Sequence, residues 1–414
     1  MIIKRGERGY SLKNDIILFT TTNLLYSLMV FVLNLIFPLL LEKELFTQVV
    51  YVFQMIILMN SLSNLGISTG LLRNSIIDKK NTLRYALLSI MLIQMSIFFL
   101  SFFNNNPITI FLSLSDLNSL EHFLFYFSVV SINIYLYNKS IMNSEKKFRK
   151  MITNVSFIIL LRILGLVLIY FFIDKTLTNF LIFIFILPFV FEYIYIFKKI
   201  INYSLRDFFS LDKRFLSFSL FCLRVFVAGA LFAYADRMII IKMKNYNADI
   251  ASLFAFAFGF LGVVSVLNFS FQNYFLNRIN PEDQESVFSF LIKIKKYFLH
   301  YIILTTLATF LVCGLIYILY DVIDFLIFPT TIILIFKTAI TSYFGFKNIL
   351  ITSFDLINYS IIVNLLRVLL VFFTLLFIGQ IHFLYVLLIV SLVMIFCELI
   401  LNKIVDVNLK LKYD

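Results

Sequence analysis

Residues 152–173 read ITNVSFIILLRILGLVLIYFFI, an apolar run that carries one charged side chain, Arg162, close to its middle. A transmembrane helix needs about 20 consecutive, predominantly apolar residues. In lipid every backbone N–H and C=O group must find a partner inside the protein, and a helix satisfies this condition within a single segment. The run therefore predicts a membrane-spanning helix with a basic residue buried near its centre.

Eleven further apolar runs of spanning length occupy the rest of the chain. They fall at 15–41, 47–72, 85–103, 119–138, 178–197, 215–241, 249–277, 297–319, 325–346, 356–378 and 382–402. Of the 414 residues, 61% are hydrophobic and 14% are charged, whereas soluble proteins are roughly 45–50% apolar and about 25% charged. This composition excludes a soluble enzyme, a disordered chain, a coiled coil and a nucleic-acid-binding protein. The sequence predicts an all-α integral membrane protein with about 12 transmembrane helices.

The lysines and arginines gather in alternate connections between these runs. The N-terminus, the C-terminal tail and the segments 73–84, 139–150, 198–214, 278–296 and 337–355 hold 27 of them, and the connections on the other side hold 5. The segment 337–355 overlaps the run 325–346, so this count includes Lys337. Cytoplasmic loops carry an excess of Lys and Arg. We therefore expect both termini in the cytoplasm, with anionic membrane lipids attracted to the basic loops.

The basic segment 198–214 separates the runs six and six, which predicts an N-terminal lobe over 1–203 and a C-terminal lobe over 204–414. Two six-helix halves are a common plan among transporters. No connection is long enough for a catalytic domain, and the sequence contains neither a Walker motif nor G-x-S-x-G. His122, His300 and His382 lie far apart, without a second metal ligand one helical turn away. We expect no enzyme activity, no metal and no cofactor.

Four basic residues lie at mid-membrane depth in the predicted helices, namely Arg162, Arg224, Lys337 and Arg367. They fall about 15, 14, 18 and 16 Å into their helices, and each such charge costs about 2.5–3.5 kcal/mol to insert. No acid lies at comparable depth in the sequence, which predicts a water-filled cavity that binds an anion. The alternative is that each base bonds to backbone carbonyls or extends toward the cytoplasmic surface.

Four asparagines in the first two predicted helices, Asn23, Asn34, Asn60 and Asn64, are costly in lipid and are expected to face the interior of the bundle. We interpret Asn34, Asn60 and Asn64 as candidate polar contacts for a substrate. Singly, the more frequent role for such a residue is an interhelical hydrogen bond.

Short motifs lie at corresponding places in the two halves of the chain. Residues 41–46 read LEKELF and precede a run that ends in NLGISTGLLR at 64–73. Residues 234–240 read YADRMII, and they are followed by ADIA at 248–251 and FQNYF at 271–275. These segments resemble the helix 1–2 and helix 7–8 elements of the polysaccharide flippases of the Wzx type.

The resemblance implies a two-lobed, V-shaped, MATE-like transporter of the multidrug/oligosaccharidyl-lipid/polysaccharide exporter (MOP) superfamily in the bacterial inner membrane. Its substrate would be an undecaprenyl-diphosphate-linked oligosaccharide, for O-antigen, capsule or a related polymer, with a polymerase and other assembly proteins as further partners. Asp236 and Arg237 would form an outer gate, although an ordinary interfacial ion pair is the alternative, and Arg73 is placed with them as a gate or coupling residue. The sequence departs from the family at 241–244, where IKMK replaces a glycine.

Two other functions remain open at this stage. An ion-coupled small-molecule or drug antiporter of the same or a facilitator-type fold would share the helix count. An integral-membrane glycan polymerase or acyltransferase is disfavoured by the missing outer domain.

Overall fold

The computed structural model describes residues 41–247 except 65, 75–78, 104–105 and 204–212, and residues 327–413 except 346, 378–379 and 381. It also describes isolated positions within 18–33 and 250–314. The described segments are helical. The helices of the first half are α2 (Lys43–Ser63), α3 (Ile67–Asn74), α4 (Lys79–Leu100), α5 (Pro107–Phe111), α6 (Ser119–Ser144), α7 (Phe148–Phe171), α8 (Leu177–Phe180) and α9 (Val190–Ile201). Those of the second half are α11 (Lys213–Tyr246), α15 (Ile327–Gly345), α16 (Asn348–Ser353), α17 (Ile357–Leu375) and α18 (Phe383–Tyr413).

Eight helical segments of the described part are long and apolar enough to cross a membrane. α15, with 19 residues, occupies the predicted run 325–346. Nearly all of the runs 15–41, 249–277 and 297–319 lie outside the described residues, so the total of twelve spans stays a prediction. The all-α, multi-pass architecture is confirmed.

The predicted single run 47–72 is wrong in one respect, because it forms two helices that meet at Gly66. The backbone of Gly66 has φ +66°, the left-handed region in which glycine carries no steric penalty. The Oδ1 of Asn64 accepts a hydrogen bond from the backbone N–H of Ser68 at 3.3 Å and so caps the first turn of α3. The break directs α3 toward the second half of the chain.

The span that ends in α9 changes its helical geometry midway. α8 continues as the π-helix η1 (Leu181–Ile186) and the 3-10 turn η2 (Leu187–Phe189) before α9 begins. Pro188 lies in η2 and has no backbone N–H to donate. Such irregular turns within a helix often mark functional positions.

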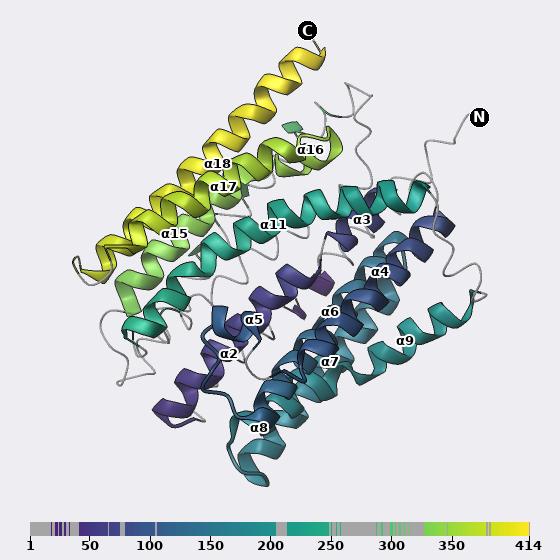
Figure 1. Cartoon of the computed structure of the whole chain (residues 1–414), viewed down its shortest axis with the longest axis vertical. Coiled ribbons are helices and arrows are strands. Elements are labelled where there is room, and N and C mark those ends of the chain that lie inside the picture. Colours follow the sequence, from purple (N-terminus) through teal and green to yellow (C-terminus); the bar gives the residue numbers. More distant parts are fainter. Residues whose placement is uncertain are drawn as a thin grey trace.

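Two groups of helices lie on either side of α11 (Figure 1). α11 packs along α17 in the second half, and its other side contacts α2 and α3. α6 lies at the centre of the first group, against α2, α3, α9 and η1. The contact between α3 and α11, which we call the seam, therefore joins the two halves of the chain, while the predicted boundary between 203 and 204 stays a prediction.

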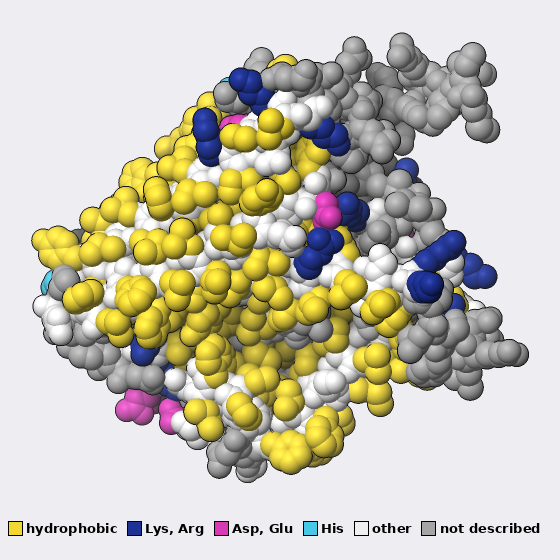
Figure 2. All heavy atoms as spheres, turned by 45° about the horizontal axis from the view of Figure 1, so that its top comes forward, with side chains coloured by type: hydrophobic (Ala, Val, Ile, Leu, Met, Phe, Trp, Pro, Cys, Tyr) yellow, Lys and Arg dark blue, Asp and Glu magenta, His cyan; other side chains and the backbone are white. Residues whose placement is uncertain are grey.

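The outer surface of the helices is apolar over a broad band, with basic and acidic side chains toward its edges (Figure 2). Leu160 and Leu164 on α7, and Ile362 and Phe373 on α17, are among the exposed residues of this kind. A soluble protein does not expose so large a continuous apolar surface. The surface fits a helix bundle surrounded by lipid.

Candidate functional site

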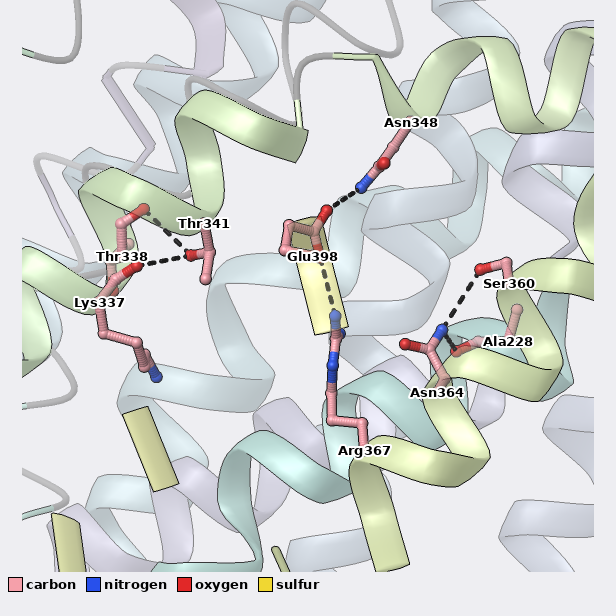
Figure 3. A network of polar contacts seen from close by, with 9 residues as sticks. All are labelled: Ala228, Lys337, Thr338, Thr341, Asn348, Ser360, Asn364, Arg367 and Glu398. Atoms are coloured by element: carbon pink, nitrogen blue, oxygen red, sulfur yellow. Dashed lines mark hydrogen bonds and ion pairs between the residues drawn. The ribbon is translucent and has the colours of Figure 1, made fainter. Parts of the chain in front are cut away.

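Arg367 on α17 and Glu398 on α18 form a buried ion pair in the second half. The Nη2 of Arg367 donates to Glu398 Oε2 at 2.8 Å, and the two side chains are 0% and 4% exposed. Asn348 of α16 donates to the other carboxylate oxygen of Glu398 at 2.5 Å (Figure 3). The guanidinium also lies over the ring of Phe232, 4.7 Å from its centroid. These contacts join three helices to α11.

Lys337 on α15 is also paired with an acid. Its Nζ donates to Asp236 Oδ1 of α11 at 2.6 Å, and the two side chains are 7% and 14% exposed. One turn nearer the start of α17 than Arg367, Asn364 donates to the carbonyl oxygen of Ala228 at 2.9 Å (Figure 3). The polar groups of the second half thus tie α15 and α17 to α11.

The expectation that no acid accompanies the mid-membrane bases is wrong for Lys337, Arg367 and Arg224. Depth counted along the backbone ignores the length of the side chains, since long basic side chains reach several ångströms toward the membrane surface. Glu398 lies on a neighbouring helix within this reach of Arg367. α11 has 34 residues, so it is about 51 Å long and exceeds the roughly 30 Å hydrocarbon core. A residue count from its start therefore misplaces Asp236.

Arg162 on α7 has a different environment. It is 1% exposed, its Nε donates to the carbonyl oxygen of Ile184 in η1 at 3.1 Å, and its guanidinium lies 5.3 and 5.1 Å from the ring centroids of Tyr26 and Phe189. Its Nη1 and Nη2 are buried without a hydrogen-bond partner in the described part of the chain. Buried guanidinium nitrogens of this kind are capable of binding an anion.

The local reason for the Ile184 contact is the proline in this span. In an α-helix the carbonyl of Ile184 would accept the N–H of residue 188, which is Pro188 and has none. Arg162 supplies a donor from the neighbouring helix. The alternative interpretation of a backbone-bonded base, left open by the sequence, is thus confirmed for one nitrogen of this side chain.

Arg73, Arg224 and Asp355 meet at the seam. Arg224 Nη2 of α11 lies 3.2 Å from Asp355 Oδ1, and Arg73 Nη1 of α3 lies 4.0 Å from the same oxygen. Burial is the main cause that lowers the pKa of Arg73, with Asp355 acting against it and Arg224 with it. The arrangement brings one base from each half to a single carboxylate.

The backbones of the two halves approach closely beside this cluster. A Cβ atom on Gly66 would lie 2.4 Å from the carbonyl oxygen of Cys222, and one on Gly70 would lie 2.4 Å from Cys222 Sγ. At Gly66 the neighbouring atom belongs to the backbone and cannot move aside, so glycine is needed there for this spacing of α3 and α11. At Gly70 a Cβ would require the Cys222 side chain to shift. The glycines of the NLGISTGLLR motif therefore hold Arg73 next to α11.

The other predicted site residues are distributed as follows. Asn60 Nδ2 donates within its own helix to the carbonyl oxygen of Ile56 at 2.8 Å, and Asn64 caps α3. Asn34 lies outside the described residues. Asp236 is paired with Lys337 inside the second half, and its neighbour Arg237 is half-buried on α11 with its own electrostatic partners. Their role as an outer gate stays a prediction.

Sequence reasoning missed two acidic partners and one further polar cluster. Asp355 and Glu398 lie near helix ends in the sequence, so a count of depth along each run excluded them as partners of the basic residues. Glu192 on α9 is 4% exposed and accepts hydrogen bonds from Asn138 at 2.6 Å and Asn154 at 3.0 Å. An acid within the apolar run 178–197 was the available signal. A small cavity beside Glu192 is lined by Thr22, Tyr135, Lys139 and Asn154 as well.

No protein-family model and no curated protein sequence matches this chain. Its structure is similar over nearly its whole length to solved MATE transporters. A MATE crystal structure in the straight conformation has a TM-score of 0.73 at 12% identity and covers 96% of each chain. The outward-facing conformation of a multidrug resistance MATE family transporter of the MOP superfamily has a TM-score of 0.68 at 12% identity, covering 97% of this chain and 96% of that one.

A third similar structure is a MOP superfamily transporter from Pyrococcus furiosus, described as having a binding pocket of reverse polarity that suggests a different function. It has a TM-score of 0.66 at 12% identity, and 96% of each chain is covered. The chain therefore has the two-lobed, V-shaped fold of the MATE transporters of the MOP superfamily. This fold confirms the predicted class, a polytopic all-α membrane protein.

Proposed function

We propose that the protein is a flippase that moves undecaprenyl-diphosphate-linked oligosaccharide repeat units from the cytoplasmic to the outer leaflet of a bacterial inner membrane. The movement would occur by alternating access between the two halves. A polymerase and other assembly proteins would then use the transported units for surface polysaccharide biosynthesis. The observation that carries the proposal is the pair of arginines at the seam. Arg73 and Arg224 come from the two halves, are 30% and 37% exposed, and share one carboxylate.

The headgroup of such a lipid is a diphosphate, and guanidinium is the side-chain group that best fits phosphate. Arginine offers five N–H donors in a planar fork and stays charged at every physiological pH. A cavity between two lobes that carries excess positive charge lowers the electrostatic cost of moving an anion across lipid. The prenyl tail remains in the bilayer while the headgroup crosses.

Arg162 is a second candidate contact for the headgroup or for an acidic sugar. Its Nη1 and Nη2 are buried and have no partner in the part of the chain that the structure describes. Leaving a charged donor unpaired is costly, so a structure that retains one is prepared to bind an anion. The description of the Pyrococcus furiosus transporter likewise connects pocket polarity with function in this fold.

A drug antiporter is the second candidate. Two observations favour it: Lys337 and Arg367 are neutralised by Asp236 and Glu398, and a similar solved structure is described as a multidrug resistance transporter. An exporter of cationic drugs uses buried carboxylates and few unpaired bases. The two candidate functions therefore make different predictions for Arg73, Arg224 and Arg162. A flippase needs these arginines for transport, and an exporter of cationic drugs does not.

A genetic experiment tests the proposal. Deleting the gene is expected to stop surface polymer assembly and to leave undecaprenyl-linked repeat units on the cytoplasmic side, and the wild-type gene should restore the polymer. Normal surface polymer in a strain without a second flippase rules the proposal out. Loss of drug resistance with normal polymer favours the antiporter instead.

A further inference from the structure

Three charged side chains at the seam carry more positive than negative charge. Arg73 and Arg224, which we call the arginine pair, face the single carboxylate of Asp355. The side chains are 30%, 37% and 50% exposed, so the group is open to solvent on one side. After the carboxylate has neutralised one guanidinium, one positive charge remains.

Asp355 uses only part of the hydrogen-bonding capacity of the arginine pair. Both guanidinium groups approach the same oxygen, Oδ1, at 3.2 Å from Arg224 and 4.0 Å from Arg73. The longer distance exceeds that of a hydrogen bond, so Arg73 is attracted without being bonded. Arginine binds carboxylate or phosphate best through two parallel N–H donors. A ligand with more oxygens than a carboxylate would engage both groups.

The two arginines extend from packed helices, whereas the carboxylate lies in a turn. Arg73 lies over the ring of Phe221 at 4.6 Å, and Gly70 of the same helix packs against Cys222 of α11. Asp355 occupies the connection between α16 and α17 with φ +57°, a conformation that few residues other than glycine, asparagine and aspartate adopt. The bases are therefore placed by packed helices, and the acid by a turn residue.

We propose that the arginine pair is the entry site for the diphosphate group of the transported lipid, and that Asp355 is a built-in competitor that a diphosphate displaces. This inference rests on the proposed function and assigns the step at which the headgroup first binds. Carboxylate and phosphate oxygens are recognised by the same guanidinium geometry, so the competition is direct. When no substrate is bound, the negative charge of Asp355 reduces the repulsion between the two guanidinium groups, so the two halves remain in contact.

The sharpest test replaces Asp355→Asn, because asparagine also adopts positive φ and keeps the turn intact. The purified full-length protein in lipid nanodiscs is titrated with inorganic pyrophosphate and, separately, with farnesyl diphosphate. Removing the competing charge is expected to tighten binding of both ligands about fivefold, equivalent to about 1 kcal/mol. Arg224→Gln is expected to weaken binding at least as much, and Arg224→Lys less than Arg224→Gln.

A matched control is the pair of Lys347 and Asp406, where one base meets one carboxylate at 2.5 Å and Asp406 is 44% exposed. Asp406→Asn removes an acid of similar exposure outside the seam and should leave pyrophosphate affinity unchanged. Equal affinities of wild type and Asp355→Asn would overturn the inference, as would an equal gain in Asp406→Asn, which indicates a general effect of net charge. Tighter pyrophosphate binding without tighter farnesyl diphosphate binding would contradict a lipid headgroup as the ligand.

Transport measured in the same variants separates this inference from the proposed function. If wild type transports the lipid-linked oligosaccharide and Asp355→Asn binds pyrophosphate no more tightly, the entry site lies elsewhere and the flippase function stands. If wild type does not transport the lipid, the proposed flippase function is wrong. The assignment of the arginine pair as the entry site for the lipid is then wrong as well, even if Asp355 competes with inorganic pyrophosphate.

Discussion

The Nε of Arg162 donates to the carbonyl oxygen of Ile184 at 3.1 Å across two neighbouring helices. Pro188 lacks the N–H that an α-helix would direct at this carbonyl, and Arg162 supplies a donor there. The side chain of Arg162 thereby supplies a hydrogen-bond donor to the backbone of the neighbouring span. Its Nη1 and Nη2 are buried and have no hydrogen-bond partner among the residues that the structure describes.

This relationship predicts an energetic coupling between Arg162 and Pro188. Arg162→Met should destabilise the wild-type background more than the Pro188→Ala background, in which residue 188 regains its N–H. The difference should be about 1–3 kcal/mol, the range for a hydrogen bond from a charged donor. Thermal midpoints of the four variants in detergent measure it. If Arg162→Met shifts the thermal midpoint equally in the wild-type and Pro188→Ala proteins, the carbonyl of Ile184 does not need Arg162 as a donor.

The buried pair of Arg367 and Glu398 is expected to behave as a structural unit. Removing one partner leaves an uncompensated buried charge, which typically costs about 3–5 kcal/mol. Arg367→Ala and Glu398→Ala should each lower membrane abundance. Replacing both with Met and Leu should restore much of it, because an apolar pair of similar volume is often tolerated. Normal abundance of Arg367→Ala combined with lost transport would instead assign Arg367 to substrate binding.

Glycine is needed at Gly66 but not at Gly229. Alanine at Gly66 would meet the carbonyl oxygen of Cys222 at 2.4 Å and would also adopt an unfavourable positive φ, whereas a Cβ on Gly229 would have no heavy atom of the described residues within 4 Å. We expect Gly66→Ala and Gly70→Ala to separate α3 from α11, with loss of stability and transport. Gly229→Ala, within α11, should be neutral or stabilising by up to about 1 kcal/mol. Wild-type behaviour of Gly66→Ala would contradict the close packing.

Cysteine labelling tests the orientation that the charge distribution predicts. In a background without native cysteines, a cysteine at position 175 should react with an impermeant thiol reagent added outside intact cells. A cysteine at position 146 should not react until the membrane is permeabilised. Lys146 lies between α6 and α7, and Lys175 lies between α7 and α8, on opposite sides of one span. Labelling of position 146 from outside would reverse the orientation.

Helix positions could be predicted from the sequence because spanning helices in lipid have a required length and composition. The pairing of Arg367 with Glu398 could not, because it depends on which helices are neighbours and on side chains that reach along the membrane normal. The break at Gly66 was also missed, since a glycine within an apolar run is compatible with a continuous helix until its packing against Cys222 is known. Arg73 was selected from a motif, and its partner Asp355 lies 282 positions further along the chain.

Reconstituted transport tests the central claim most directly. Proteoliposomes containing the full-length protein receive undecaprenyl-diphosphate-linked oligosaccharide in one leaflet, and a glycan-cleaving enzyme added outside reports the fraction that reaches the outer leaflet. We predict faster exposure than in protein-free vesicles, strongly reduced exposure with Arg224→Gln, and partial exposure with Arg224→Lys. A rate equal to that of protein-free vesicles, together with uptake of a cationic dye by the same preparation, would contradict a flippase and identify a drug antiporter.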